Sequence, residues 1–311
     1  MGDAHYKHHV RLAVIEILRR AAEHDGCCNK AVNTKRLILN LLLAAKEGAL
    51  PVRSIVTAGE LMGVSSNNVR VTLARLVADS LVESVGRGEY RLGAGGSALA
   101  AEVAGWRERL QSLKRWRGSY LAVGCAGLGR ADRAALSRRE RALTLTGFKE
   151  FEGDLWLRPD NLVGGAQRVR ERLERLQVSP EQAVEARPLV FRAAEFSDAD
   201  SARIAALWDV KRIERGYQET RARLEQWLEG ADRLAPQVAA RQSFLLGDGA
   251  IRQWVFDPLL PEELIDGELR REFLASVVRF DEAGQRIWRA LSRTADERAG
   301  STGRAAALGG A

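Results

Sequence analysis

The sequence predicts a mixed α+β protein built from a winged helix-turn-helix, a ferredoxin-like α/β sandwich and a helical carboxyl-terminal domain. Three observations support this. Residues 31–96 contain three helical patterns followed by a short hairpin pattern. Residues 119–195 alternate strands and helices in the ferredoxin-like order strand, helix, strand, strand, helix, strand. Residues 196–293 show helical periodicity throughout. A chain of 311 residues, 46% hydrophobic and 29% charged, is long enough for two or three globular domains.

The stretch from Gly63 to Asp79 has the pattern of the turn and second helix of a helix-turn-helix. Gly63 suits the turn, because a residue without Cβ adopts positive φ readily. Ser65 suits the first position before the helix, because its hydroxyl can accept a hydrogen bond from an amide of the first turn. The apolar residues at helical spacing are predicted to face inward. They are Val69, Leu73, Leu76 and Val77.

The opposite stripe of this helix, called here the outer stripe, consists of Asn67, Arg70, Val71, Ala74 and Ala78. It contains no acid, so it could enter a major groove without repelling phosphate. An asparagine can bridge N6 and N7 of adenine, an arginine can bridge O6 and N7 of guanine, and a small apolar group can contact a thymine methyl. We therefore expect Asn67 and Arg70 to read bases. An ordinary amphipathic surface helix is the alternative for this stretch taken alone.

The neighbouring segments favour the winged helix-turn-helix. Residues 33–43 and 54–62 are predicted helices upstream. Downstream, residues 81–85 and 89–92 form a predicted hairpin with Arg87 at its tip, although a plain surface hairpin would have the same pattern. The residues predicted to contact DNA are Ser65, Ser66, Asn67, Asn68, Arg70, Val71, Arg75 and Arg87, of which Ser66, Arg75 and Arg87 are expected to hold phosphates.

The excess of positive charge is localised in the same region. The chain has a net charge of +7, with 5 basic and 4 acidic residues in 1–32, 13 and 7 in 33–118, and 30 of each in 119–311. A localised basic segment is typical of a protein that binds phosphate groups of nucleic acid. A basic face that only confers solubility is the alternative.

Composition shifts divide the rest of the chain. Residues 1–30 are expected to form an N-terminal extension with a short helix, 97–118 a linker helix and 294–311 a disordered tail. Four helices are predicted in the carboxyl-terminal domain, over residues 198–206, 210–229, 235–254 and 269–290. Breaks are expected at Gly230, at Gly247-Asp248-Gly249 and at Pro258–Pro261.

Motifs of catalysis, metal binding and cofactor binding are missing from the sequence. All four histidines lie before residue 25, which excludes a Ser-His-Asp or Cys-His arrangement in the later domains. The nucleophile-elbow, zinc-protease, Walker and dinucleotide patterns do not occur. No apolar run approaches the ~20 residues that span a bilayer, and no signal-peptide pattern is present. We therefore expect a cytoplasmic binding protein that is not an enzyme, without metal, cofactor or membrane partner.

Three motifs resemble those of the PaaX family of transcriptional regulators. The first is the helix-turn-helix stretch 63–79, the second is Leu207-Trp208-Asp209-Val210 followed by Tyr217, and the third is the stretch 256–264 with its sequence Phe-Asp-Pro-Leu-Leu-Pro-Glu-Glu-Leu. The third motif is the most specific. The order of the three predicted parts matches as well, so that the resemblance covers residues 33–290, while the first thirty residues extend beyond the usual start and the wing is short.

The resemblance implies a bacterial repressor of the phenylacetate-catabolism type, released from its operator by an aryl-CoA thioester. It implies a homodimer on a palindromic double-stranded DNA operator, with half-sites about 34 Å apart. Trp208 and Tyr217 are candidate effector-binding residues, with a packing role as the equal alternative. For Asp257 and Pro258 a packing role is favoured. The other functions left open are an enzyme acting on a CoA thioester or nucleotide, and an interaction scaffold that does not bind DNA.

Overall fold

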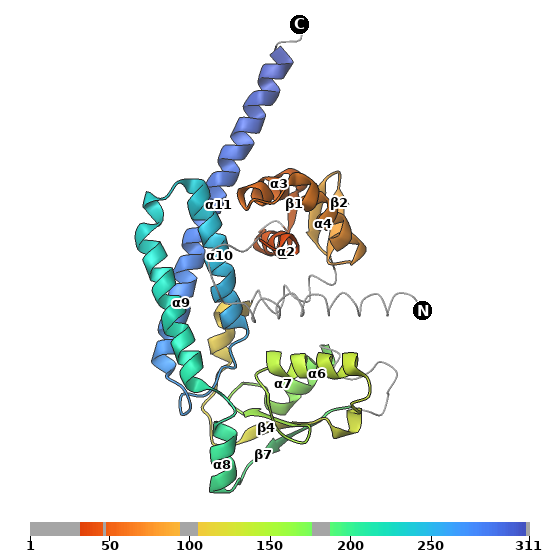
Figure 1. Cartoon of the computed structure of the whole chain (residues 1–311), viewed down its shortest axis with the longest axis vertical. Coiled ribbons are helices and arrows are strands. Elements are labelled where there is room, and N and C mark those ends of the chain that lie inside the picture. The colour runs from red at the N-terminus through yellow and green to blue at the C-terminus, as the bar shows by residue number, and fades with distance from the viewer. Residues whose placement is uncertain (1–31, 46–47, 94–104, 176–186, 309–311) are drawn as a thin grey trace. The chain divides into compact units, whose positions relative to one another are not determined.

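Two small antiparallel sheets and a carboxyl-terminal helical region make up the protein, which confirms the predicted mixed α+β class (Figure 1). The computed structural model describes residues 32–45, 48–93, 105–175 and 187–308. The predicted helix over residues 10–23 lies outside this part of the chain. In the described part, no helix has the length and apolarity that crossing a membrane requires.

The chain divides into two compact units. The first consists of residues 1–105, 224–250 and 277–311, and the second of residues 106–223 and 251–276. The predicted carboxyl-terminal helical domain thus contributes residues to both units. Each unit is described below by itself.

Residues 32–93 of the first unit form what we call the N-terminal module. Its elements are α2 (Thr34–Ala44), β1 (Ala49–Pro51), α3 (Val52–Leu61), α4 (Ser66–Ala78), β2 (Val82–Gly86) and β3 (Glu89–Leu92). Asn33 caps α2, because its side chain accepts a hydrogen bond from the amide of Arg36. The strands form an antiparallel sheet in the order β1-β3-β2. The sequence did not predict β1, because three residues are too few for an alternating pattern.

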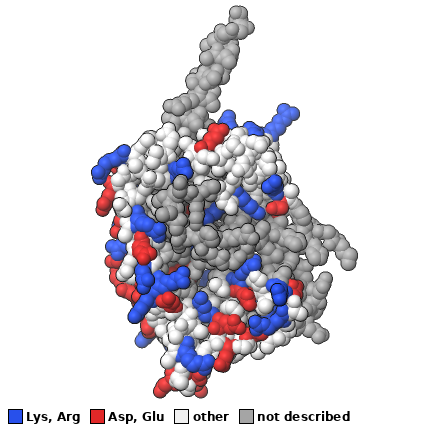
Figure 2. Space-filling view, in the orientation of Figure 1, with Lys and Arg blue, Asp and Glu red and all other residues white. Residues whose placement is uncertain are grey.

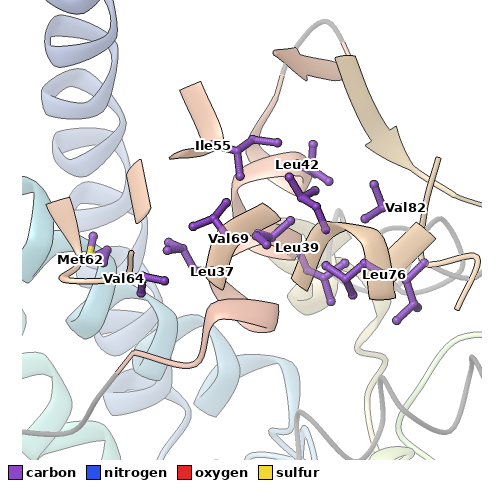
Figure 3. Packing of buried hydrophobic residues seen from close by; sticks show 12 residues of the cluster. Leu37, Leu39, Leu42, Ile55, Met62, Val64, Val69, Leu76 and Val82 are labelled. Atoms are coloured by element: carbon purple, nitrogen blue, oxygen red, sulfur yellow. The ribbon is translucent and has the colours of Figure 1, made fainter. Parts of the chain in front are cut away.

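The core of the N-terminal module is built from aliphatic side chains of all three helices (Figure 3). Leu37 and Ile38 of α2, Ile55 of α3 and Val69 of α4 are fully buried. Leu73 and Leu76 are buried as predicted, but Val77 is 37% exposed, and the prediction that it faces inward was wrong. Residue 77 follows Leu76 by one position, which turns it about 100° away from the buried stripe of a helix with ~3.6 residues per turn.

Helices α3 and α4 approach each other closely at Gly59. A Cβ built on Gly59 would lie 2.5 Å from Cγ2 of Val69. Since both residues are buried, any side chain at position 59 would push α4 away from α3. The glycine is therefore required by packing.

We expect Gly59→Ala to destabilise the protein by about 1–3 kcal/mol through overpacking against Val69. Urea unfolding monitored by circular dichroism measures the change. Gly249→Ala is the control, because a Cβ there meets nothing within 4 Å and a helical glycine-to-alanine change stabilises by roughly 0.5–1 kcal/mol. The double variant Gly59→Ala/Val69→Ala should relieve the clash. A Gly59→Ala protein as stable as wild type would contradict the close approach.

The sheet of the second unit has four antiparallel strands in the order β5-β6-β4-β7. Its elements are β4 (Tyr120–Gly124), α6 (Arg133–Leu145), β5 (Lys149–Glu152), β6 (Leu155–Pro159), α7 (Gly165–Arg175) and β7 (Leu189–Ala193). Helices α6 and α7 lie on the same face of the sheet (Figure 1). Leu143 of α6 and Leu173 of α7 pack there against Leu121, Val123 and Val190 of the strands.

The prediction of a linker α-helix over residues 97–118 was wrong for the part of this range that the structure describes. Gly105–Ser112 is a 3-10 helix, η1, and the chain then forms a bridge between Leu113 and Leu162. Tertiary contacts explain the difference. The carbonyl of Trp106 accepts a hydrogen bond of 2.6 Å from Nε1 of Trp254, and the guanidinium of Arg109 donates to the carbonyls of Trp254 and Asp257. The segment is thus packed into the second unit.

Four α-helices follow β7, namely α8 (Asp198–Ala205), α9 (Val210–Gly230), α10 (Pro236–Val255) and α11 (Gly267–Leu308). The short 3-10 helices η2 (Ala126–Leu128) and η3 (Ala231–Arg233) complete the elements of the described chain. The breaks predicted at Gly230 and at residues 258–261 occur, since α9 ends at Gly230 and residues 256–266 separate α10 from α11.

Two predictions about these helices were wrong. The break at Gly247-Asp248-Gly249 does not occur, because α10 runs through it. Gly247 is needed for packing, since a Cβ there would lie 3.1 Å from Cε1 of Phe280. The tail predicted to be disordered from residue 294 instead continues α11 to Leu308. Its many alanines have high helix propensity.

Candidate nucleic-acid interface

The outer stripe of α4 lies on the surface of the N-terminal module. All five of its residues, Asn67, Arg70, Val71, Ala74 and Ala78, are exposed. Val71 is 42% exposed, so the stripe presents an aliphatic group to solvent beside its polar groups. The stripe contains no carboxylate. An exposed helix face with an amide, a guanidinium and a free aliphatic group can contact base edges in a major groove.

The first turn of α4 is fixed by side-chain hydrogen bonds. Oγ of Ser65 accepts from the amide of Asn68 at 3.3 Å, as the predicted cap requires. Nε of Arg70 donates to Oγ of Ser66 at 3.4 Å. This bond holds the Arg70 side chain along the helix and uses only Nε. Both Nη groups keep their hydrogens for another acceptor.

Asn68 has a different role from the other polar residues of α4. Its Nδ2 donates to Oγ1 of Thr34 at 3.3 Å, and its Oδ1 accepts from Oγ1 of Thr72 at 3.2 Å. Both ends of the amide are therefore engaged within the module, and the side chain connects α4 to the start of α2. A contact of Asn68 with DNA, which the sequence predicted, would have to use the remaining hydrogen or lone pair of this amide, or replace one of these bonds.

A surface hollow of about 420 Å³ lies between the start of α2 and one flank of α4. Its lining includes the side chains of Lys35, Thr72 and Arg75, together with Asp79. Nζ of Lys35 lies 3.6 Å from Oδ2 of Asp79, so one of the two cations is partly neutralised. Arg75 is exposed. Cationic and hydroxyl groups beside an open hollow are suited to a phosphate of a nucleic-acid strand.

Arg87 is exposed in the turn between β2 and β3. Gly88 next to it has φ of +75°, a conformation that glycine adopts at little cost. A register shift between Ser84 and Gly86 adds to the twist of the hairpin. The hairpin thus presents its arginine to solvent at the tip, as predicted.

Elsewhere on the protein, several arginines form ion pairs with acids. On the face drawn in Figure 2, cationic and anionic side chains are interspersed. Pairs such as Arg221 with Glu272, Arg279 with Glu225 and Arg271 with Glu268 explain the pattern. Exposed ion pairs of this kind add little to stability. They neutralise the part of the chain after residue 118, as its equal numbers of basic and acidic residues indicated.

The structure places the predicted effector residues Trp208 and Tyr217 in the core of the second unit. Tyr217 is 0% exposed, its ring stacks on Phe273 with centroids 5.1 Å apart, and its hydroxyl donates to Oδ2 of Asp257. Burial, followed by the charge of Asp257, raises the pKa of Tyr217 far above its ordinary value. Trp208 is 3% exposed, and its Nε1 has no hydrogen-bond partner among the described residues. The burial and contacts of Tyr217 favour the packing role that the sequence left as the alternative.

The turn after α10 is held by hydrogen bonds from several elements, which the sequence did not reveal. Its carbonyls at residues 257, 258, 259 and 260 accept from Arg109, Arg158, Asn161 and Arg270 respectively. Leu259 has φ of +51°, a strained conformation for a residue with a branched side chain. Oδ1 of Asp257 accepts from the amide of Leu259 at 2.7 Å and holds this conformation. The packing role favoured for Asp257 and Pro258 agrees with this arrangement.

Asp248 of α10 connects the N-terminal module to the other helices of the first unit. Its carboxylate accepts hydrogen bonds from Nε of Arg36 at 2.6 Å and from Nδ2 of Asn40 at 2.9 Å, both on α2. Phe244 and Trp288 pack against the core of the module nearby. Sequence reasoning missed this contact because the stretch 247–249 was interpreted as a break.

In the described part of the chain, no three His, Cys, Asp or Glu side chains group closely enough to hold a metal ion. The outer stripe, the hollow beside it and the hairpin tip remain as the features with a distinct chemistry. Each of them exposes groups that can donate hydrogen bonds or carry positive charge.

Comparison with known proteins supports one part of the sequence interpretation. Residues 208–290 match the family model described as PaaX-like protein C-terminal domain. Among solved structures, the chain is similar to uncharacterized protein Rv0674 from Mycobacterium tuberculosis, with 20% sequence identity, a TM-score of 0.52 and coverage of 81% of this chain and 99% of that chain. No curated protein matches. At this identity the structural likeness shows a shared fold alone. The resemblance to the PaaX family is confirmed over the matched residues.

Proposed function

We propose that this chain, which carries a PaaX-like C-terminal domain over residues 208–290, is an effector-responsive, DNA-binding transcriptional repressor. The observation that carries the proposal is the exposed, acid-free outer stripe of α4. PaaX-like proteins are regulators of transcription, which makes a DNA-binding module at the other end of the chain a consistent partner for the matched domain. We place the protein in the cytoplasm and expect it to act as a homodimer.

The N-terminal module has the parts of a winged helix-turn-helix in this proposal. Helices α2, α3 and α4 precede the β2–β3 hairpin, so α4 is the recognition helix and Arg87 lies in the wing. In the second unit, the strands numbered from β4 onward occur in the sheet order 2-3-1-4 with antiparallel neighbours. This order supports a ferredoxin-like sandwich for residues 119–195.

The outer stripe would read the major groove. Asn67 would bridge an adenine, Arg70 would donate both Nη groups to a guanine, and Val71 would contact a thymine methyl. Ser66, Arg75 and Arg87 would bind phosphates, together with Lys35 in the hollow beside α4. Asn68 would keep its bonds to Thr34 and Thr72 and hold α4 in place. Because a dimer presents two recognition helices, the operator would have two half-sites about 34 Å apart.

An aryl-CoA thioester would release the protein from the operator by changing the spacing of the two recognition helices. Tyr217 is fully buried and takes no part in effector binding in this proposal. The control of an aromatic or acyl-CoA catabolic operon follows from this choice of effector.

A gel-shift titration with a duplex covering the promoter beside the gene tests the proposal. The affinity for the duplex should fall steeply as the salt concentration rises, because binding releases the cations that are condensed on the phosphates. Three phosphate-binding cations per protomer, Lys35, Arg75 and Arg87, give a dimer a slope of log K against log salt of about −5. Addition of phenylacetyl-CoA should release the duplex. The absence of a salt-sensitive shift would indicate a scaffold, and turnover of the thioester that is abolished by one carboxylate substitution would indicate an enzyme.

A further inference from the structure

The carboxylate of Asp248 on α10 joins two residues of α2 within the first unit. It accepts hydrogen bonds from Nε of Arg36 at 2.6 Å and from Nδ2 of Asn40 at 2.9 Å, and it forms an ion pair with Nη2 of Arg36. Arg36 and Asn40 are four positions apart, so their side chains lie on one face of α2. The side chains of Arg36 and Asp248 are 19% and 16% exposed, so the pair is largely removed from water. We call these three residues the Asp248 clamp.

Helix α10 is itself held in place beside Asp248 by close packing on α11. A Cβ on Gly247 would lie 3.1 Å from Cε1 of Phe280, and a Cβ on Gly284 would lie 3.2 Å from Cβ of Ser243. The two helices therefore approach closely over the turn of α10 that precedes Asp248. The carboxylate is thus presented to α2 from a backbone with little freedom to shift.

The other side of the clamp leads to the recognition helix. Oγ1 of Thr34, two positions before Arg36 on α2, accepts a hydrogen bond of 3.3 Å from Nδ2 of Asn68 on α4. Leu37 of α2 and Val69 of α4 belong to the same buried core. Because α2 and α4 are joined by this bond and this core, a rotation of α2 on α10 would carry the outer stripe of α4 with it.

Apolar contacts alone would hold the module in this orientation weakly. Among the described residues outside the module, Phe244 and Trp288 are the hydrophobic side chains packed against its core, and both are only partly buried. Hydrophobic burial has no preferred direction. The bonds of the clamp do have one, because an arginine and a carboxylate meet in a defined geometry. Breaking them would leave poorly solvated charges on both helices, so the clamp favours one orientation over the others.

We propose that the Asp248 clamp fixes the orientation of the N-terminal module on α10 and thereby sets the half-site spacing that the protein accepts. This role rests on the proposed function, because it requires a dimer with one recognition helix in each half-site. Binding of the second half-site is intramolecular, and it adds affinity only where the geometry permits both contacts at once. A fixed module makes this requirement strict, since one extra base pair moves a half-site by about 3.4 Å and turns it by about 35°.

Duplexes that differ in the spacing between half-sites test this role. Footprinting of the full chain on the promoter duplex maps the half-sites, and one or two base pairs are then inserted or removed between them. Insertion of two base pairs should lower the affinity of wild type by about 10-fold or more, because the second half-site is lost. Asp248→Ala should bind all these duplexes with affinities within about 3-fold of one another. Asp248→Glu, which keeps the carboxylate, should restore part of the discrimination.

Asp232→Ala is the matched control. Asp232 is exposed in η3 of the same unit, so its replacement makes the same change in net charge and leaves the clamp intact. The variant should depend on half-site spacing as wild type does. Discrimination that persists unchanged in Asp248→Ala, or that is lost equally in Asp232→Ala, would overturn the role of the clamp.

Urea unfolding measures the clamp without DNA. Arg36→Ala and Asp248→Ala should each lower the urea midpoint, and the double variant should lower it by less than the sum of the two changes, because the residues interact directly. Additive changes would show that the clamp is not formed in solution and would overturn its role. A protein with coupled residues that binds no duplex would instead overturn the proposed function, and the role in half-site spacing with it.

Discussion

Replacing Arg70 with alanine is expected to weaken binding to the operator by about 1–3 kcal/mol and to relax sequence preference at one base pair. Arg70 is exposed in the middle of the outer stripe, and its Nε bond to Ser66 already orients the side chain. The binding free energy that is lost should therefore be that of a guanine contact. Affinities for the operator and for each single-base variant of it, measured by fluorescence anisotropy, give the position that Arg70 reads.

Two controls separate base reading from general electrostatic attraction. Arg75→Ala should weaken binding to all sequences alike and reduce the salt slope of the dimer by about 2, because each protomer loses one phosphate contact. Arg279→Ala removes the same charge outside the N-terminal module and should have no effect. If Arg70→Ala instead behaved like Arg75→Ala, with selectivity intact, Arg70 would not read a base.

Replacing Asp257 with alanine is expected to lower the free energy of unfolding by about 2–4 kcal/mol, since it leaves two buried donors without an acceptor. The donors are the hydroxyl of Tyr217 and the amide of Leu259. Tyr217→Phe should cost less, about 1–3 kcal/mol. Urea unfolding of the two single variants and the double variant gives the coupling between the residues. Additive effects would show that the buried hydrogen bond contributes nothing of its own.

The same carboxyl should make stability depend on pH. Burial raises the pKa of Asp257, although hydrogen bonds from Tyr217 and Leu259 and the charges of Arg109 and Arg270 oppose the rise. The folded protein therefore holds this proton to a higher pH than the unfolded chain. The stabilisation is complete below the unfolded pKa and is lost as the pH rises through the folded pKa. Asp257→Asn removes the titration, so wild type should lose stability relative to this variant as the pH rises above the unfolded pKa of about 4. A constant difference would contradict the raised pKa.

The sequence predicted those features that depend on local pattern. The order of helices and strands, the Ser65 cap and the exposure of Arg70 and Val71 follow from periodicity and capping alone. The carboxyl-terminal motif around Asp257 indicated a resemblance to the PaaX family, and residues 208–290 match the model of the PaaX-like C-terminal domain. These signals are short in range, because a helix face repeats within a few residues.

The features that the sequence did not predict depend on contacts between distant segments. The bond from Asn68, a residue predicted to contact DNA, to Thr34 was not foreseen because it spans 34 positions. Asp248 was placed in a break because its partners are on α2, more than 200 positions away. The sequence left effector binding and packing as equal alternatives for Tyr217, because its bond to Asp257 spans 40 positions. A helix pattern shows which face is apolar, but it does not identify the polar partner that meets it.

The close approach at Gly59 limits which positions can change when the DNA target of the protein changes during evolution. The side chain missing at position 59 sets how near α4 lies to α3, because Val69 fills that space. Val69 is two positions from Asn67 and one from Arg70, so any change that moved it would also shift the residues proposed to read bases. Descendants of this gene can therefore acquire a new DNA target by exchanging residues of the outer stripe, while position 59 stays the same.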